Sequence, residues 1–344
     1  MRIGISLLAF AVAAFLALGA GETLASHVVC GQTITTDTTL DSDLTNCPGD
    51  GIVIGAPNIE LELNGHTVDG TGVGEGIDNS AGHDGVEIEH GTITQFGIGV
   101  LLTNASGNEL ARLSVSQSTG DAGIQLVSSS GNRLRRNTSS GNAAHGIHLL
   151  GSDNNRLVNN TANLNGDDGI DLLNSDNNKL EGNTANQNVD DGILLVSANL
   201  PGTSSSNNRL VENRANNNGG TGFLLHVGVG NLLRSNTANQ NGAQGMFLLT
   251  SDNNTLRLNT TSSNGTDGVV IFSDSDGTLL DRSIANQNGD DGLDTDNAAT
   301  TFVGNTANNN VDLGIEAVPG VTDAGGNKAS GNGNAAQCTF VTCT

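Results

Sequence analysis

Apolar residues alternate with other residues in short stretches along most of the chain, and each stretch follows a glycine. Most of these glycines are spaced by about 23 residues, and each marks one repeat unit; they are Gly97, Gly123, Gly146, Gly169, Gly192, Gly222, Gly245, Gly268, Gly292 and Gly314. Ile147 and Leu149, and then Ile170 and Leu172, show the alternation that follows the glycine. Because side chains in a strand point to opposite faces with a period of two, each unit is predicted to contain a short β-strand with one buried face.

Each unit continues with a polar turn, a second apolar position and a closing polar segment. The turn is rich in Ser, Asp and Asn, as in residues 152–155, and such side chains bond readily to nearby backbone groups. Leu157 and Leu180 supply the second inward position, and Asn-Thr-Ala-Asn closes the units at residues 160–163 and 183–186. After the N-terminal apolar run the sequence shows no period of 3.6 residues, so the units are predicted to consist of strands and turns.

Strands that turn in the same direction in every unit stack in parallel, with about 4.8 Å between neighbouring coils. The chain is therefore predicted to be all-β, a single-stranded parallel β-helix (solenoid) of about ten or more coils. The leucine-rich repeat is the main alternative solenoid of similar period, but its Leu-x-x-Leu-x-Leu signature is missing.

Two further columns of equivalent residues are expected in such a helix. Small residues would form a tight corner of each coil, namely Ala162, Ala185, Ala215 and Ala238. Asparagines would form a ladder in which each amide bonds the coils above and below, namely Asn137, Asn160, Asn183, Asn213, Asn236, Asn259 and Asn305.

The part of the chain that leads into the repeats has a pattern of its own. It comprises residues 30–34 (Cys-Gly-Gln-Thr-Ile), 61–70 (Leu-Glu-Leu-Asn-Gly-His-Thr-Val-Asp-Gly) and 90–93 (His-Gly-Thr-Ile). With the repeats from Gly97 to Ile315, it resembles the right-handed parallel β-helix proteins of the pectin-lyase-like superfamily, particularly exported bacterial proteins with NosD-like β-helix repeats. The resemblance implies a right-handed coil. Members of this group include polysaccharide lyases, hydrolases and epimerases as well as binding and surface proteins, so the fold alone does not define the chemistry.

The two ends of the chain indicate export. Residues 1–25 have a basic start, an apolar run and a small-residue end, which is typical of a signal peptide. The four cysteines permit three pairings. Because the ends of an elongated solenoid lie too far apart for cross-pairing, Cys30–Cys47 and Cys338–Cys343 are the expected disulfides. We expect caps at residues 26–50 and 318–344, on either side of a helix that spans residues 51–317.

The composition excludes several classes of partner. Asp and Glu number 36 against 13 Lys and Arg, and the resulting net charge of −23 repels nucleic acid. Trp and Tyr, which usually provide stacking platforms for bases and sugars, are absent. No second apolar run is long enough to span a membrane. By the resemblance, a polysaccharide or cell-surface glycan is the expected partner of a secreted or surface-located monomer.

Acidic and imidazole side chains gather beside the repeat glycines of four successive units. They are Asp121, His145, His148, Asp167, Asp168, Asp171, Asp190 and Asp191. Asp168 and Asp191 occupy equivalent positions about 5 Å apart, so they are expected to titrate as a pair. Paired acids with different pKa values are what glycoside cleavage requires. We therefore predict three catalytic residues, Asp168, Asp191 and the helper His145, and four substrate-binding residues, Asp167, Asp171, Asp190 and His148.

Two of these segments resemble polygalacturonase-type hydrolases. Residues 167–170 (Asp-Asp-Gly-Ile) are similar to the Asp-Asp segment of that family, and residues 145–147 (His-Gly-Ile) to its His-Gly segment. The order of the two segments is reversed here, and no Arg-x-Lys segment matches the substrate clamp of that family. The Asp-Pro-His signature of mannuronan epimerases is absent.

A structural role is the alternative for the same acids. Asp-Asp-Gly recurs at residues 290–292, and Thr-Asp-Gly lies at residues 266–268, as expected of residues that only initiate turns. No cofactor is required by the pattern, but Ca²⁺ would suit stacked carboxylates, including a second cluster of Asp290, Asp291, Asp294 and Asp296. The sequence favours an exported solenoid that binds a polysaccharide or serves as a surface scaffold without catalysis. A polysaccharide-cleaving hydrolase or lyase that uses the stacked Asp pair is the alternative.

Overall fold

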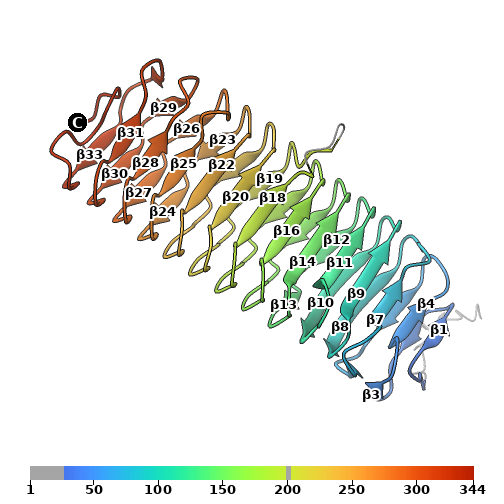
Figure 1. The fold of residues 1–344 in the computed structure, drawn as a ribbon. Helices are drawn as coiled ribbons and strands as arrows, with labels where there is room; N and C mark the ends of the chain where they lie inside the picture. Colours follow the sequence, from blue (N-terminus) through green and yellow to red (C-terminus); the bar gives the residue numbers. More distant parts are fainter. Residues whose placement is uncertain (1–26, 199–202) are drawn as a thin grey trace, which may run out of the picture.

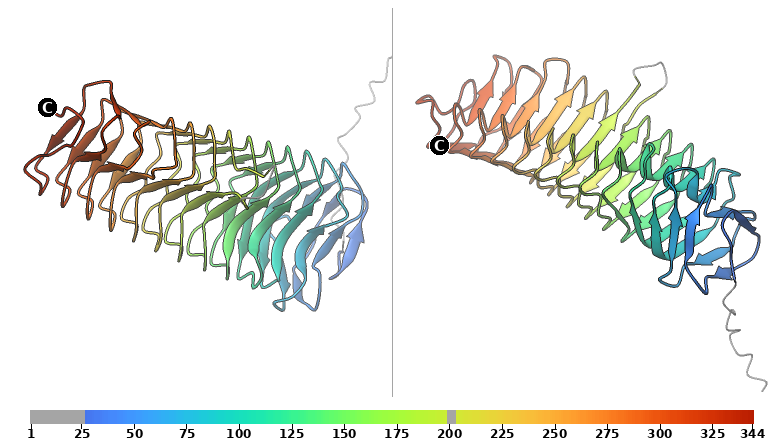
Figure 2. Two further views of the ribbon diagram at one scale, coloured as in Figure 1. Left: turned by 45° about the horizontal axis from the view of Figure 1, so that its top comes forward. Right: turned by 60° about the horizontal axis from the view of Figure 1, so that its bottom comes forward.

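The computed structural model describes residues 27–198 and 203–344 (Figure 1). These residues form strands and turns, and none of them belongs to a helix that could cross a membrane. The strands form three parallel sheets that run along one elongated molecule (Figure 2). The all-β parallel β-helix prediction is therefore confirmed. The predicted signal peptide, residues 1–25, lies outside the described residues.

The first sheet has 13 strands, one from each coil, which confirms the expectation of about ten or more coils. Its spatial order is also the chain order: β1 (Gln32–Ile34), β4 (Ile52–Ile54), β7 (Glu75–Asn79), β9 (Ile98–Thr103), β11 (Ala122–Val127), β14 (His145–Leu150), β16 (Ile170–Leu173), β18 (Ile193–Val196), β20 (Phe223–His226), β22 (Met246–Leu249), β25 (Val269–Ile271), β28 (Leu293–Thr295) and β31 (Ile315–Ala317).

The second sheet has 16 strands. Along its main path lie β2 (Thr38–Thr39), β5 (Glu60–Glu62), β8 (Glu87–Thr94), β10 (Glu109–Ser116), β12 (Arg133–Arg135), β15 (Arg156–Val158), β17 (Lys179–Glu181), β19 (Arg209–Val211), β21 (Leu232–Arg234), β23 (Thr255–Arg257), β26 (Leu279–Asp281), β29 (Thr301–Val303) and β32 (Thr322–Asp323). Off this path lie β3 (Leu44–Cys47), β6 (Thr67–Gly70) and β13 (Thr138–Ser139).

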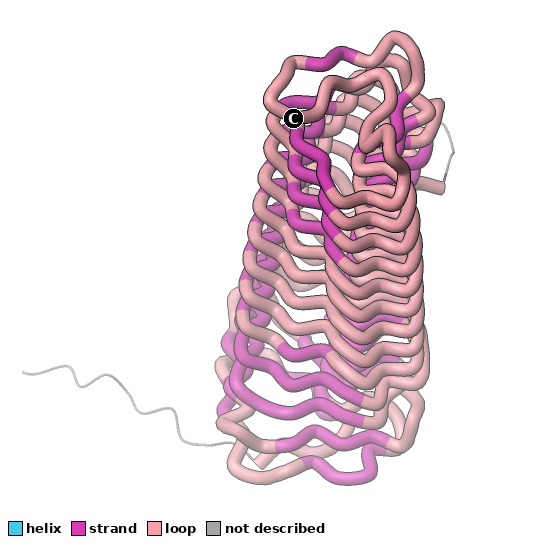
Figure 3. Tube along the Cα trace, turned by 90° about the vertical axis from the view of Figure 1, so that its left-hand side faces the viewer, coloured by secondary structure: helices cyan, strands magenta, loops and turns pink. Residues whose placement is uncertain are grey.

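A third sheet of four strands follows the later coils; it consists of β24 (Thr260–Ser262), β27 (Ile284–Asn286), β30 (Thr306–Asn308) and β33 (Lys328–Ser330). Figure 3 shows that equivalent strands and turns of successive coils lie directly above one another. The pairing is in register, so Ile147 pairs with Ile170 and Ile170 with Ile193. Strands of the same sheets also lie in both segments that were expected to form caps.

The core consists of the columns that the repeat predicts. Ile147, Leu149 and Leu157 point inward and are fully buried, and so are their equivalents in the next four coils. Ala162 and the alanines equivalent to it are also fully buried at the corner. Because every coil buries the same positions against its neighbours, the core is continuous along the solenoid.

The repeat glycine is required by close packing at the corner. A Cβ atom added to Gly169 would lie 2.6 Å from the Ala185 Cβ and 2.7 Å from the Gly192 backbone oxygen. No side chain fits at such distances, so glycine at this position of the coil is a consequence of how tightly the coils stack.

The predicted asparagine ladder is present. The Asn160 backbone N–H donates to Asn183 Oδ1 at 2.9 Å, and the bond repeats from coil to coil. The Asn183 side-chain amide in turn donates to the Leu157 carbonyl oxygen at 3.0 Å. Ser283 takes the place of asparagine in one coil and continues the ladder. Each rung thereby satisfies buried backbone groups that face no strand partner.

Two further asparagine ladders were not predicted. One joins Asn142, Asn165, Asn188, Asn218, Asn241, Asn264, Asn288, Asn310 and Asn332. The other joins Asn108, Asn132, Asn155, Asn178, Asn208, Asn231 and Asn254. The turns of this solenoid are thus held together mainly by buried amide groups.

The cysteines pair locally, as predicted. Cys30 and Cys47 form one disulfide, and Cys338 and Cys343 form the other, which leaves no free cysteine. Each bond ties residues near one end of the helix, where the last coil has no neighbour to cover it.

Candidate functional site

The predicted site residues gather on the outer face of the 13-stranded sheet, around β11, β14, β16 and β18. Gln125, His148 and Asp171 are paired in register and therefore form one outward column. His145 is the first residue of β14, and Asp168 lies in the turn before β16. The structure thus brings the two histidines together with the acids of the neighbouring coils.

Asp168 and Asp191 are stacked as predicted, and each has a task in holding the coils together. The Asp191 backbone N–H donates to Asp168 Oδ1 at 2.9 Å, and the Thr221 backbone N–H donates to Asp191 Oδ1 at 2.5 Å. The same bond recurs far along the helix, where the Asp291 N–H donates to Asp267 Oδ1 at 3.0 Å. One carboxylate oxygen of each of these two predicted catalytic acids therefore accepts a hydrogen bond that joins adjacent coils.

His145 is enclosed by carboxylates. Its Nδ1 lies 3.4 Å from Asp168 Oδ2, and its Nε2 lies 3.7 Å from Asp167 Oδ2 and 3.9 Å from Asp171 Oδ2. Burial alone would lower the pKa of His145, but the three carboxylates outweigh burial and raise the pKa to about 9. His145 is consequently an imidazolium at neutral pH.

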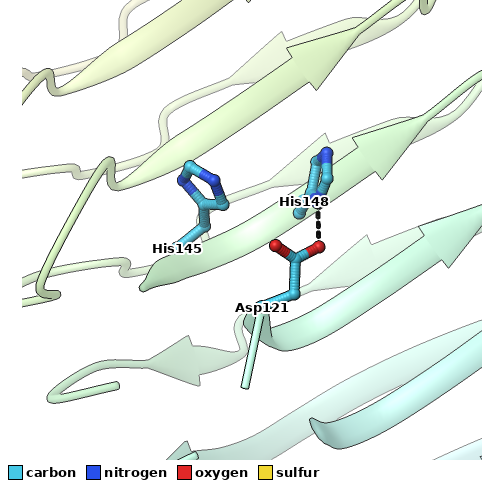
Figure 4. Close-up of side chains that lie close together, drawn as sticks. All are labelled: Asp121, His145 and His148. Carbon is cyan, nitrogen blue, oxygen red and sulfur yellow. Dashed lines mark hydrogen bonds and ion pairs between the residues drawn. The ribbon is translucent and has the colours of Figure 1, made fainter. Parts of the chain in front are cut away.

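His148 is the more deeply buried imidazole, with 5% of its surface exposed. Its Nδ1 is hydrogen-bonded to Asp121 (Figure 4), at 2.9 Å from Oδ2, and its Nε2 lies 3.3 Å from Asp171 Oδ2. Burial lowers the pKa of His148. The ring centroids of His148 and His145 are 5.1 Å apart, so one imidazole of the pair is charged while its neighbour is neutral.

Asp171 and Asp191 are buried acids on the same face, and burial raises the pKa of each to about 7. Three buried polar atoms of the cluster have no hydrogen-bond partner: His145 Nδ1, His148 Nε2 and Asp171 Oδ1. Such atoms are uncommon in folded proteins, and three of them lie together in this cluster.

Several groups of side chains could hold a cation. Asp121, His145 and His148 offer ligand atoms within 4.8 Å of one another, and so do His145, Asp167 and Asp168. Near the other end, oxygen ligands come from two overlapping groups: Asp290, Asp291 and Asp312, and Asp291, Asp294 and Glu316. Asp296, expected in that second cluster, belongs to neither group. Ca²⁺ binding there stays a prediction.

The sequence and the structure were compared with known proteins. The family model of the right-handed β-helix region matches residues 34–172, 140–261 and 228–343. The chain is a right-handed β-helix protein. No curated protein sequence matches it. The family match confirms the handedness that the sequence resemblance implied.

Solved structures share the fold of this β-helix protein at low sequence identity. The A-module of the Azotobacter vinelandii mannuronan C-5 epimerase AlgE6 has 13% identity and a TM-score of 0.61, over 89% of this chain and 91% of that chain. A double mutant of the periplasmic alginate epimerase AlgG has 15% identity and a TM-score of 0.60, over 87% and 78%. The Streptococcus pneumoniae surface protein and adhesin PfbA has 11% identity and a TM-score of 0.51, over 90% and 91%.

Sequence reasoning missed the apolar continuation of the outward column. Leu194, Leu224, Phe247 and Val270 follow Asp171 in register on β18, β20, β22 and β25. The available signal was the second residue after each repeat glycine, which points away from the core. On this face the β-helix therefore presents apolar side chains directly beside buried acids and imidazoles, an arrangement suited to contacting a ligand with both apolar and hydroxyl groups.

Proposed function

We propose that the protein is an exported, monomeric β-helix that binds a neutral polysaccharide on the outer face of its 13-stranded sheet, between β11 and β25. Disulfides form and persist mainly in oxidising compartments, so the two bonds support export. Structural neighbours named as alginate epimerases and as a bacterial surface adhesin support a glycan partner by analogy of fold.

The proposal rests on the change from polar to apolar side chains along the outward column. Gln125, His148 and Asp171 are polar, whereas Leu194 and Phe247 on the following coils are apolar and half-buried. A sugar ring has apolar C–H surfaces and polar hydroxyl groups. A chain of sugars lying along the column would place both kinds of group against matching side chains.

The charge of this face favours a neutral chain over a polyuronate. Asp167 and Asp190 are acidic residues on this face that are not buried, and His145 is the imidazolium beside Asp167. The protein as a whole has a net charge of −23. Carboxylate groups of an acidic polysaccharide would be repelled both at long range and at contact.

Binding can be tested with the mature chain, a panel of neutral polysaccharides, and alginate as the acidic comparison. We expect affinity for a neutral chain and none for alginate. Phe247→Ala removes an aromatic surface from the proposed contact and should weaken binding about tenfold, which corresponds to about 1.4 kcal/mol. Ile284→Ala is the matched control, because Ile284 is 41% exposed on β27 of another sheet.

The two variants separate specific contact from a general loss of apolar surface. Equal affinities for wild type, Phe247→Ala and Ile284→Ala would refute the proposed surface. Binding to alginate but to no neutral polysaccharide would refute the electrostatic argument.

Glycan cleavage is the second candidate function, and it is favoured by the acids whose pKa burial raises. Asp191, with a pKa of about 7, would donate a proton to the leaving oxygen, and Asp168 in the adjacent coil would act as the second carboxylate. His145 lies 3.4 Å from Asp168 and would orient it. The test is the formation of new reducing ends or unsaturated products from the same panel.

The expected result for an enzyme is activity in the wild type and loss of at least about a hundredfold in Asp168→Asn, with the glycan still bound. Asp290→Asn, in the repeated turn far from the cluster, is the matched control and should retain activity. Absence of products from every polysaccharide in the panel would refute the second candidate and leave the first intact.

A further inference from the structure

We propose that Asp121, His145 and His148 together bind one divalent transition-metal ion of the Zn²⁺ type on the outer face of the sheet. The three residues come from two adjacent coils. Asp121 precedes β11, and both histidines belong to β14 (Figure 4). The inference goes beyond glycan binding and does not depend on it.

The spacing of the three side chains suits a shared ion. Their ligand atoms lie within 4.8 Å of one another, and Asp121 Oδ2 is 2.9 Å from His148 Nδ1. Ligand atoms at about 2.0–2.2 Å from a tetrahedral Zn²⁺ lie about 3.5 Å from each other. The His145 and Asp121 side chains would have to move closer to the ion to reach that spacing.

An independent observation comes from buried atoms that lack partners. His148 is 5% exposed and Asp171 is 4% exposed, yet neither His148 Nε2 nor Asp171 Oδ1 makes a hydrogen bond. Leaving such atoms unbonded is unfavourable, because they have lost their bonds to water. An ion bound beside them would give the imidazoles a defined orientation and the surrounding carboxylates a compensating positive charge.

In each imidazole, the ring nitrogen that points away from the proposed ion faces a carboxylate, as in known metal sites. A histidine ligand almost always donates its second ring N–H to a carboxylate or carbonyl group. Here His148 Nε2 lies 3.3 Å from Asp171 Oδ2 and His145 Nδ1 lies 3.4 Å from Asp168 Oδ2, without hydrogen-bond geometry, so an ion on the opposite ring nitrogens would orient the rings to complete these two bonds. This leaves His148 Nδ1 and His145 Nε2 as the ligand atoms, with Asp171 and Asp168 as positioning residues; the ion would displace the proton from His145 Nε2.

The donor set indicates the class of metal. Two imidazole nitrogens and a carboxylate oxygen suit Zn²⁺ and its first-row neighbours, whereas Ca²⁺ is bound by oxygen ligands. The Asp121 side chain is 51% exposed, so solvent reaches the site from the outside. One position of the ion would therefore stay open to water or to an oxygen atom of a ligand.

The test is calorimetric titration of the tag-free mature chain with ZnCl₂ after treatment with a chelator, and no glycan is present. We expect one ion per chain, confirmed by elemental analysis. Asp121→Asn and His148→Gln should each weaken binding at least about tenfold. Both are conservative, because Asp121 is half exposed and Gln125 occupies the equivalent column position one coil earlier.

His66→Gln is the matched control, because His66 Nδ1 also lies 3.0 Å from a carboxylate, that of Asp43, but belongs to none of the three-residue groups found among the described residues. It should bind Zn²⁺ like the wild type. Circular dichroism establishes that all variants are folded. The proposal is overturned if the wild type binds no stoichiometric ion, if both site variants bind as tightly as the wild type, or if equimolar Ca²⁺ displaces Zn²⁺.

Discussion

Replacing Asp191 by asparagine is expected to stabilise the protein at neutral and alkaline pH. The Asp191 side chain is 6% exposed, and burial raises its pKa from 3.8 to about 7. A raised pKa means that the folded state binds the proton more tightly than the unfolded state. The resulting stability is fully present below about pH 4 and is lost as the pH rises through about 7.

The size of the effect follows from the same two pKa values. A difference of about three units at about 1.36 kcal/mol per unit gives a cost of up to about 4 kcal/mol for the ionised carboxylate above pH 8. Asparagine cannot ionise, and its side-chain oxygen can still accept the bond from the Thr221 N–H. Asp191→Asn should therefore gain up to about 4 kcal/mol over wild type at pH 8 and almost nothing at pH 4.

Urea denaturation at pH 4, 6 and 8 measures this difference, provided that the m-values of the two proteins agree. Asp323→Asn provides a control of opposite sign, because hydrogen bonds from the Thr342 backbone N–H lower the pKa of Asp323. That variant should lose stability at neutral pH and match the wild type in acid. If Asp191→Asn were less stable than wild type at pH 8, the carboxylate would be stabilised as an anion and the reasoning from burial would be wrong.

Three further predictions concern the fold. Asn183→Ala removes four side-chain hydrogen bonds inside the ladder and should lower the free energy of unfolding by about 3–5 kcal/mol. Asn183→Ser, which imitates Ser283, should lower it less. Equal losses for the two variants in urea denaturation would contradict the ladder argument. Leu258→Asn should raise the free energy of unfolding by about 1 kcal/mol, because Leu258 is exposed and its φ of 56° lies in the left-handed region, which asparagine tolerates better than leucine. No gain in urea denaturation would show that the backbone is unstrained at this position. Gly169→Ala should lower the melting temperature, since the new Cβ meets Ala185, and an unchanged temperature would show that the corner can expand.

Most of the fold could be predicted because each coil has to bury apolar side chains at the same positions. The inward positions of Ile147 and Leu157 recur in nearly every unit, so periodicity alone assigns them to the core. The ladders that begin at Asn108 and Asn142 could not be found in the same way. Asparagines in turns commonly bond their own backbone, and only the register of the coils shows that these amides bond the next coil instead.

The candidate site was predicted less completely. Equivalent positions in adjacent units correctly placed Asp168 beside Asp191, but a repeat does not reveal which oxygen already accepts a backbone hydrogen bond. The contact of His148 with both Asp121 and Asp171 depends on side-chain direction across three strands. Such information is three-dimensional, so the sequence could group His148 with Asp121 in one cluster but could not show that the two side chains are in contact.

The outward column is the part of a β-helix where new chemistry disturbs the fold least. A change at an inward leucine would leave a cavity that typically costs about 2–5 kcal/mol, and a change in a ladder would leave buried amides unbonded. The outward residue faces neither constraint, so leucine at position 194 and aspartate at position 171 are both compatible with the same coil. Yet Asp171 is buried deeply enough to raise its pKa to about 7, and its Oδ1 has no partner. A solenoid selected only for stability would continue with leucine there, so the unfavourable burial of Asp171 beside His148 is the strongest physical argument that this face of the protein has a ligand.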